Sequence, residues 1–133
     1  MGIILKNKYL LDSNIVIYFF NGITDDESLL EILKHSFNIS IITKIEFLSW
    51  HQLKQDEELN KKAKEFISNA TVYELDEVVA NQTIKNRQQF KIKTPDAIIG
   101  ATAIVHGFEI VTNNFEDFKN LGLKITTINI KNT

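Results

Sequence analysis

Acidic side chains recur in this sequence where a short apolar segment ends or a helix is expected to begin. Asp12 directly follows the apolar run Tyr9–Leu11, Glu46 comes shortly after Ile39–Ile42, and Asp96 follows the only proline. In an open α/β sheet, ligands bind at the carboxyl ends of the strands. We therefore expect these three carboxylates to meet at one edge of a sheet.

A fourth position follows the late apolar segment Glu109–Thr112. Asn114 stands two residues beyond it, and Asp117 lies three residues further on. An amide carbonyl can bind a metal or its water without adding a negative charge. We predict that Asn114 is a working member of the site and that Asp117 is the more dispensable of the two. The alternative is that Asn114 only caps the turn that follows.

Three carboxylates in one place repel one another, which raises their pKa values. A hard divalent cation such as Mg²⁺ or Mn²⁺ removes that conflict, because these ions take oxygen ligands. Such an ion lowers the pKa of a bound water and neutralises charge on a phosphodiester in the transition state. The predicted chemistry is therefore metal-dependent phosphodiester hydrolysis, with Asp12, Glu46, Asp96 and Asp117 as the candidate metal ligands.

Each acid also has a purely structural interpretation. Asp12 is a good helix N-cap, and Asp96 complements the dipole of a helix that begins near Pro95. Glu46 is harder to explain this way, because its neighbours Ile45 and Phe47 are apolar and a buried carboxylate without a partner is costly. The convergence of all three acids favours a site over three separate caps.

Strand-like and helix-like segments alternate along the chain, which predicts an α/β fold with a mostly parallel central sheet and helices on both faces. The predicted strands are residues 9–11, 39–42, 72–73, 109–112 and 126–130. Helices are predicted directly after Asp12, over 25–34, from an N-cap at Thr43 to about Gln55, around 59–67, from an N-cap at Asp76 to about Gln89, and over 97–105.

The segment Thr94-Pro95-Asp96 is the sharpest local signal. Thr94 suits the N-cap, and Pro95 suits the first helical position, where its missing N–H costs nothing. The helix that follows is apolar on nearly all sides, which predicts burial against the sheet. Small residues such as Gly100 would let it approach closely, and Gly107 is expected to end it in a left-handed conformation.

Composition limits the other possibilities. The 133 residues fit one compact domain, predicted to span 1–133, and the absence of cysteine excludes a disulfide framework, a thiolate metal site and a cysteine nucleophile. No stretch approaches the roughly 20 apolar residues of a membrane span. The apolar run Ile3–Leu5 is shorter than a secretory signal requires, so a cytoplasmic location without membrane contact is expected.

The charge balance is 15 basic against 17 acidic residues, a net charge of −2, whereas nucleic-acid-binding domains are usually basic. The distribution is uneven, however, because every charge between Ala80 and Pro95 is positive. That run either contacts substrate phosphates or is the solvated face of a helix. Its members are Lys85, Arg87, Lys91 and Lys93.

Four segments resemble the motifs of PIN domains. Residues 10–14 (LLDSN) resemble the opening Asp-[Ser/Thr]-[Asn/Ser] motif, and 43–48 (TKIEFL) resemble the helix that carries the second acid. Residues 94–103 (TPDAIIGATA) are similar to the helix that carries the third, and 110–118 (IVTNNFEDF) to the late T-x-[DN]-x-x-x-F motif. The intervals between the acids, 46 − 12 = 34 and 96 − 46 = 50, also fit.

The resemblance covers nearly the whole chain and, given its small size, is nearest to the VapC-type toxins. It implies a PIN-like three-layer fold and an Mg²⁺- or Mn²⁺-dependent endoribonuclease, usually a homodimer, held inactive by a VapB-type antitoxin. The catalytic candidates are Asp12, Glu46, Asp96 and Asn114, and the substrate-binding candidates outside the basic run are Ser13, Asn14 and Thr112. The chain departs from many relatives in having Asn114 where they carry Asp.

Other interpretations remain open at this point. A PIN-type RNA-processing nuclease without an antitoxin would share every residue named above. An aspartate-nucleophile phosphatase also has an acid after its first strand, but it needs a second aspartate at the position of Asn14. A receiver domain wants a lysine after a late strand, where this chain has Asn113 and Asn114. A binding module without catalysis would have no need of all three acids.

Overall fold

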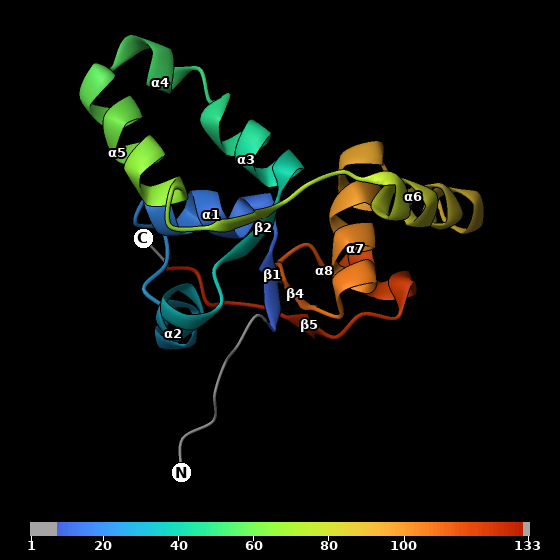
Figure 1. The fold of residues 1–133 in the computed structure, drawn as a ribbon. Coiled ribbons are helices and arrows are strands. Elements are labelled where there is room, and N and C mark those ends of the chain that lie inside the picture. The colour runs from blue at the N-terminus through green and yellow to red at the C-terminus, as the bar shows by residue number, and fades with distance from the viewer. Residues whose placement is uncertain (1–7, 132–133) are drawn as a thin grey trace.

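A single parallel sheet forms the centre of the computed structural model, which describes residues 8–131. The strands lie in the order β3-β2-β1-β4-β5, and every neighbouring pair is parallel (Figure 1). The last strand is much shorter than the predicted 126–130. The strands are β1 (Tyr9–Leu11), β2 (Asn38–Ser40), β3 (Thr71–Tyr73), β4 (Glu109–Val111) and β5 (Ile125–Thr126).

Helices cover both faces of this sheet, which confirms the predicted three-layer α/β architecture. They are α1 (Ser13–Phe20), α2 (Glu27–His35), α3 (Ile41–Leu48), α4 (Gln52–Gln55), α5 (Glu57–Ile67), α6 (Glu77–Gln89), α7 (Thr94–His106) and α8 (Phe115–Phe118), followed by the 3₁₀ helix η1 (Lys119–Leu121). The long helix predicted from Thr43 to Gln55 is in fact two helices, because the chain leaves the helical path at Ser49 and Trp50.

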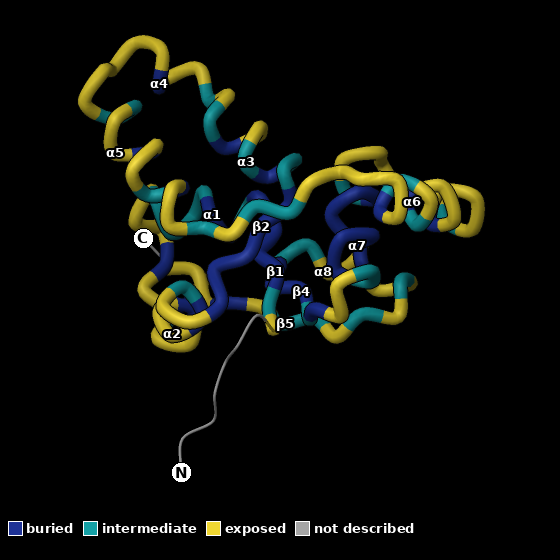
Figure 2. The backbone as a smooth tube through the Cα atoms, viewed as in Figure 1, coloured by how far each residue is buried: buried dark blue, intermediate teal, exposed yellow. Residues whose placement is uncertain are grey.

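Alternation along the strands builds two separate cores, since successive side chains of a strand point to opposite faces. Leu11 and Val111 pack with α1, α2, α3 and α5 on one face. Leu10 and Ile110 pack with α7 and with Phe118 of α8 on the other. Strands β1 and β4 are therefore buried on both sides, as Figure 2 shows for the centre of the molecule. Because both cores hold β1 and β4, the ends of these two strands are fixed relative to one another.

Side-chain caps begin several helices as the sequence predicts. Asp12 accepts a hydrogen bond from the Ser13 N–H at the start of α1, and Asp76 accepts one from the Val79 N–H at the start of α6. Two predicted caps are wrong. Ser40, not Thr43, caps α3. Lys93 occupies the cap position of α7 without a side-chain bond, so Thr94 is already helical.

Helix α7 is buried over most of its length, from Ala97 to Ala103, and α6 packs along it. A Cβ at Gly100 would lie 2.5 Å from Leu121 Cδ1, so glycine allows the close packing predicted there. Gly107 ends the helix with φ of 72°, also as predicted. Within residues 8–131 no helix has the length and apolar character needed to cross a membrane. The run Ile3–Leu5 and the two C-terminal residues of the predicted domain lie outside the described residues.

Candidate active site

The carboxyl ends of β1, β2 and β4 meet at one edge of the sheet, because these strands are parallel neighbours. Asp12 directly follows β1, Glu46 lies on the helix that follows β2, and Asp117 lies on the short helix after β4. Asp96, from the first turn of α7, completes the group, since the charges of Asp12, Asp117 and Glu46 all act on its carboxyl. We call this group of four carboxylates the acidic edge.

Asp12 is the most firmly held of the four acids, with 4% of its surface exposed. Its Oδ1 accepts a hydrogen bond from the Ser13 N–H at 2.8 Å, and its Oδ2 accepts one from the Thr112 hydroxyl at 2.7 Å. Burial raises the pKa of Asp12, these two hydrogen bonds oppose the rise, and the charges of Glu46 and Asp117 add to it. Both oxygens therefore have set positions before any ligand binds.

Glu46 is joined to α1 through a hydroxyl pair. The Ser13 hydroxyl lies 2.5 Å from Glu46 Oε1 and 3.1 Å from Thr43 Oγ1. Thr43 is fully buried, whereas Glu46 is exposed, contrary to the partial burial that its apolar neighbours indicated. Sequence reasoning assigned Thr43 only a capping role. A hydroxyl one helical turn before an acid, at i and i+3 on the same face, is the signal that could have identified it.

Asp96 is partly buried, and its pKa rises to about 6. Burial is the main cause, and the negative charges of Asp12 and Asp117 follow. A hydrogen bond between the Asp96 and Asp117 side chains acts in the same direction. A pKa this far above the usual value is typical of carboxylates that crowd one another at a functional site.

Asn114 and Asp117 act on each other directly. The Asn114 side-chain amide donates a hydrogen bond to Asp117 Oδ2, and the Asn114 N–H donates to Thr112 Oγ1 at 3.0 Å. The Asn114 side chain makes no capping bond to α8. Asn114 nevertheless occupies the N-cap position of α8, and its carbonyl accepts a hydrogen bond from the Asp117 N–H at 3.2 Å. Asp117 is the charged member of this pair, and its charge acts on both Asp12 and Asp96.

The donor set consists of carboxylate oxygens, which suits Mg²⁺ or Mn²⁺ rather than a softer metal. Within residues 8–131, however, no three His, Cys, Asp or Glu side chains stand in the arrangement of a finished metal site. The two observations agree physically, because like charges repel and Asp12, Glu46 and Asp117 are each held by a separate hydrogen-bond partner. The charges of Glu46 and Asp117 raise the pKa values of Asp12 and Asp96, and the four carboxylates would have to draw together around a cation.

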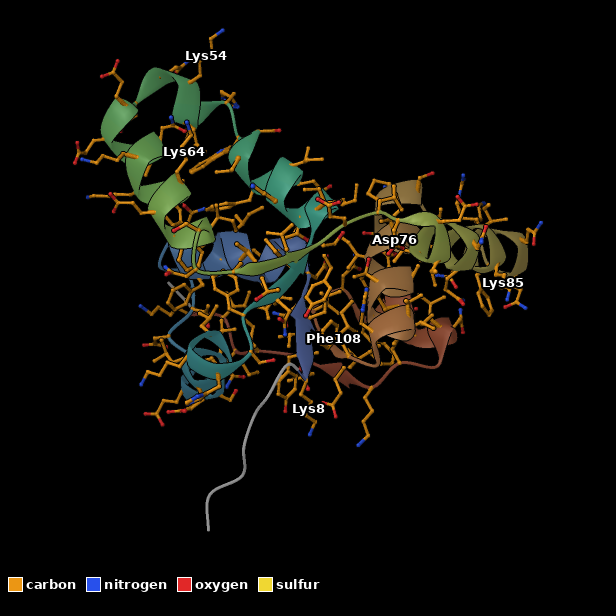
Figure 3. The ribbon with its side chains drawn as sticks, viewed as in Figure 1. Lys8, Lys54, Lys64, Asp76, Lys85 and Phe108 are labelled. Carbon is orange, nitrogen blue, oxygen red and sulfur yellow. The ribbon has the colours of Figure 1, made fainter. Side chains whose placement is uncertain are left out.

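Three of the four predicted basic residues lie next to this edge. A hollow of about 400 Å³ is lined by Arg87, Lys91, Ile92, Lys93 and Asp117. Its basic side is formed by the last turn of α6 and the connection to α7, which together we call the basic turn (Arg87, Lys91 and Lys93). Lys85 lies outside this hollow, on the part of α6 that extends away from the sheet (Figure 3).

The basic turn is held in place from within. The buried Asn86 side chain donates a hydrogen bond to the Ala97 carbonyl at 3.2 Å, and Arg87 Nε donates to the Ile92 carbonyl at 3.3 Å. The first of these bonds joins α6 to the turn of α7 that carries Asp96. Asn14, another candidate residue, is partly buried and its Oδ1 has no hydrogen-bond partner among the described residues.

Comparison with known proteins agrees with this fold. The family model described as PIN domain matches residues 9–123. That span includes every strand except β5 and all four acids of the acidic edge. The chain therefore belongs to the PIN-domain family.

One similar protein is "Ribonuclease VapC1" of Rickettsia felis, which is 44% identical over 46 residues. The match spans about a third of that relative, 34% of its length and 34% of this chain. A "Toxin-antitoxin complex from Klebsiella pneumoniae" contains a chain 28% identical to this one, with a TM-score of 0.72, covering 86% of this chain and 93% of that one.

Two further solved structures share the fold at lower identity. VapBC2 from Rickettsia felis, bound to a promoter DNA fragment, has a chain with a TM-score of 0.78, 23% identity and coverage of 91% and 98% of the two chains. DNA-bound VapBC from Salmonella typhimurium gives a TM-score of 0.78, 24% identity and coverage of 90% and 97%. The PIN fold thus extends over nearly the whole of the described chain.

Proposed function

We propose that this protein is a divalent-metal-dependent endoribonuclease and the toxin of a type II toxin–antitoxin pair. The observation that carries the proposal is the acidic edge. Four carboxylates from four separate elements meet there, and their negative charges raise the pKa values of Asp12 and Asp96. Membership of the PIN family supports it, as do the ribonuclease name of the Rickettsia felis relative and the toxin–antitoxin complex of the Klebsiella pneumoniae neighbour.

Asp12, Asp96, Glu46 and Asp117 are the residues that would hold Mg²⁺ or Mn²⁺. A bound cation of this kind supplies a Lewis acid for the phosphodiester and a lowered pKa for water. The chain's own contribution is to present ionised oxygens in set directions. A cation also offsets the mutual repulsion that raises the pKa values of Asp12 and Asp96.

Ser13 and Thr112 act as positioning residues rather than as direct RNA contacts. The Thr112 hydroxyl donates to Asp12, and the Ser13 hydroxyl lies within hydrogen-bond distance of Glu46. Such outer-shell bonds orient ligating carboxylates and keep them basic. Asn114 has the same relation to Asp117, which it holds through its side-chain amide. The chain thus has Asp117 as its fourth acid, with Asn114 supporting it.

The basic turn binds the phosphates of the RNA. Arg87, Lys91 and Lys93 are exposed and border a hollow that ends at Asp117, so a strand lying across the acidic edge passes these cations. Phosphate contacts of this kind add affinity without reading sequence and weaken with salt. They explain how a chain of net charge −2 binds a polyanion.

The same acidic edge gives an antitoxin a target. A group of carboxylates attracts a basic side chain, and a partner that inserts one would block cation and RNA together. We include a VapB-type antitoxin, a cytoplasmic location and a homodimer in the proposal. The Klebsiella pneumoniae neighbour is part of a toxin–antitoxin complex, and the dimer is tested by the mass of the purified protein in solution.

The experiment is cleavage of structured RNA by the purified chain with Mg²⁺ or Mn²⁺, against the same reaction in EDTA and with Asp96→Asn. We expect cleavage that stops in EDTA and is lost in the variant. Full activity in EDTA or in Asp96→Asn would overturn the nuclease proposal. Expression in growing cells tests the toxin role. Harmless expression of a chain shown to cut RNA would make it a processing nuclease instead.

A further inference from the structure

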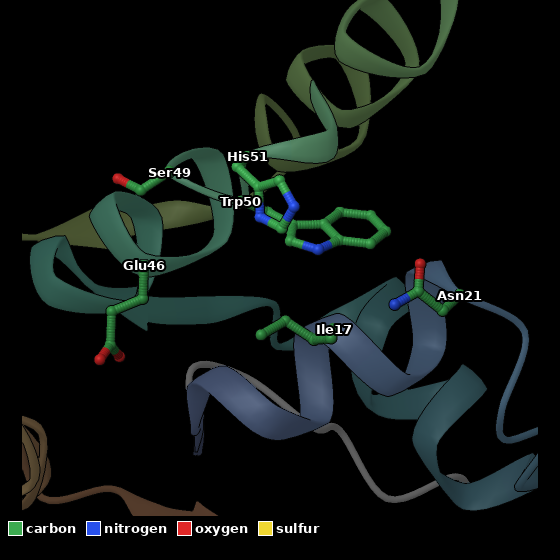
Figure 4. A pocket seen from close by; sticks show the side chains of 6 residues that line it. All are labelled: Ile17, Asn21, Glu46, Ser49, Trp50 and His51. Atoms are coloured by element: carbon green, nitrogen blue, oxygen red, sulfur yellow. The ribbon is translucent and has the colours of Figure 1, made fainter. Parts of the chain in front are cut away.

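A second hollow opens beside the acidic edge, on the side away from the basic turn. Its volume is about 410 Å³, within the range of small-ligand pockets. It lies between α1 and the segment that joins α3 to α4 (Figure 4). We call it the aromatic hollow, and its lining residues are Ile17, Asn21, Glu46, Ser49, Trp50 and His51.

The walls of this hollow suit a flat, uncharged ring. Trp50 and Ile17 are partly buried and pack against the larger core, which limits their movement. Figure 4 shows the Trp50 indole across from Ile17, with Asn21 beside its far end. Asn21 and His51 are exposed, so their amide and imidazole groups are open to a ligand. An apolar and aromatic slot with a few polar groups at its rim binds a heterocycle by stacking and hydrogen bonding.

Charge decides which part of an RNA enters. Glu46 is the acid among the lining residues, and neither lysine nor arginine is among them, so no cation of the lining would hold a phosphate there. The cations stand at the other hollow, which shares Asp117 with the acidic edge just as this one shares Glu46. In Figure 1 α1 and α3 lie on one side of β1, and α7 and α8 lie on the other.

Building on the proposed nuclease function, we propose that the aromatic hollow holds one unpaired nucleobase of the RNA, stacked on Trp50, next to the phosphodiester at the acidic edge. A paired base cannot stack on a side chain, so the hollow selects loops and single strands. Asn21 and His51 then bias which base is accepted. Trp50 is in this way a specificity-determining residue, and the acids supply the cleavage.

The test uses the fact that Trp50 is the only tryptophan of the chain. The full-length Asp96→Asn variant, in which cleavage is blocked, is titrated with a short RNA hairpin while tryptophan emission is followed. A hairpin with the same stem and phosphates but abasic loop nucleotides is the matched probe. We expect the intact loop to quench the emission and the abasic loop to bind with little quenching. Equal quenching by both hairpins would overturn the inference.

Variants give a second, independent reading through the anisotropy of labelled hairpin RNA. Trp50→Ala should weaken binding of the intact loop by about tenfold, and Trp50→Phe by less, because any aromatic face stacks with a base. Asn21→Ala, at an exposed position, should change which loop base is preferred. Ile45→Ala is the control, since Ile45 is an exposed residue of α3 outside the hollow.

Thermal melts establish that each variant is folded, and Trp50→Phe keeps a ring against the core should Trp50→Ala unfold. Unchanged binding and cleavage-site choice in both a folded Trp50→Ala and Asn21→Ala would overturn the inference and leave the nuclease proposal standing. Should Trp50→Ala unfold, unchanged base preference in Asn21→Ala together with equal quenching by the two hairpins would do the same. If the intact loop alone quenches the emission but the wild-type protein cuts no RNA, the nuclease proposal is overturned and the binding of a base in the aromatic hollow stands. Quenching by a basic antitoxin peptide, with none by RNA, would make the hollow a partner surface and also overturn the inference.

Discussion

The two hollows beside the acidic edge are similar in volume and opposite in chemistry. The basic turn supplies three cations around about 400 Å³, whereas the aromatic hollow supplies Trp50 and Ile17 around about 410 Å³. Each includes one acid of the edge, Asp117 in the first and Glu46 in the second. A nucleic acid strand has the same division, with charged phosphates along one side and neutral bases along the other. The acids lie between the two hollows, where those two halves of a strand would meet.

Removing an acid should have the largest effect, because the acids serve both sides. We expect Asp12→Asn or Asp96→Asn to lower RNA cleavage on the order of a thousandfold, since several kcal/mol of transition-state stabilisation depend on a correctly held cation. Single-turnover cleavage with saturating Mn²⁺ is the measurement. RNA binding, followed by anisotropy, should change far less. Full cleavage activity in either variant would mean that the acidic edge does not carry out the reaction.

Loosening one acid should cost less than removing it. Thr112→Val deletes the hydroxyl that donates to Asp12 Oδ2, and we expect a loss of about 10- to 100-fold in metal affinity or cleavage. Thr83→Val is the matched control, because the buried Thr83 hydroxyl bonds only within α6, to the Val79 carbonyl. A metal titration of the cleavage rate separates the two variants. Equal losses in both would mean that Thr112 contributes stability alone.

Reversing charge on the basic turn tests the proposed phosphate contacts separately from the aromatic hollow. The double variant Arg87→Glu with Lys91→Glu should weaken RNA binding by about tenfold and lower its salt slope by about 1.4, the value for two single-strand phosphate contacts. Base preference in the loop should not change, because phosphates carry no sequence. Lys85→Glu is the control, since Lys85 lies outside the hollow. An identical slope in wild type and double variant would return this run to a solvated helix face.

Removing one charge from the crowded acids should raise stability, although it lowers activity. The folded pKa of Asp96, about 6, lies above the ordinary value of 3.8, so its ionisation lowers the free energy of unfolding as pH rises between these values. In EDTA at pH 7, Asp96→Asn should therefore be more stable by about 1 kcal/mol, allowing for screening at a half-exposed group. The gain should shrink towards pH 4 in thermal melts. A destabilised variant at pH 7 would contradict the repulsion.

The smallest effect is expected at Asn114. Its side chain makes no cap bond to α8, so Asn114→Ala should not show the loss of about 1 kcal/mol that a broken cap brings. Asn114→Asp adds a charge beside Asp117 and should shift the Mg²⁺ dependence of the rate with little change in melting temperature. If Asp117→Asn leaves cleavage intact while Asn114→Ala abolishes it, Asn114 is the ligand and Asp117 its support.

Local patterns were sufficient for much of the fold. Asp12 and Asp76 are strong caps, Gly107 is a strong stop, and the strand-helix alternation predicts a parallel sheet. The predicted boundaries of helices and strands are wrong where two local preferences compete. Ile41 and Ile42 are β-branched and favour a strand, yet the Ser40 cap and burial of the helix behind it begin α3 at Ile41. Residues 127–130 have strand propensity, but β5 pairs with β4 only at Ile125 and Thr126.

The sequence by itself determined the family and pointed to three acids of the candidate site, because an acid after a strand, Pro95 before Asp96 and Gly107 after an apolar helix act over a few residues. Only the tertiary structure decided how those acids are held. The bonds from Thr112 to Asp12 and from Ser13 to Glu46 span 100 and 33 residues, distances over which sequence spacing carries no geometry. It also decided that the Asn114 amide bonds to Asp117 and that Trp50 and Glu46 line the same hollow, since side-chain direction depends on how neighbouring helices pack rather than on residue type.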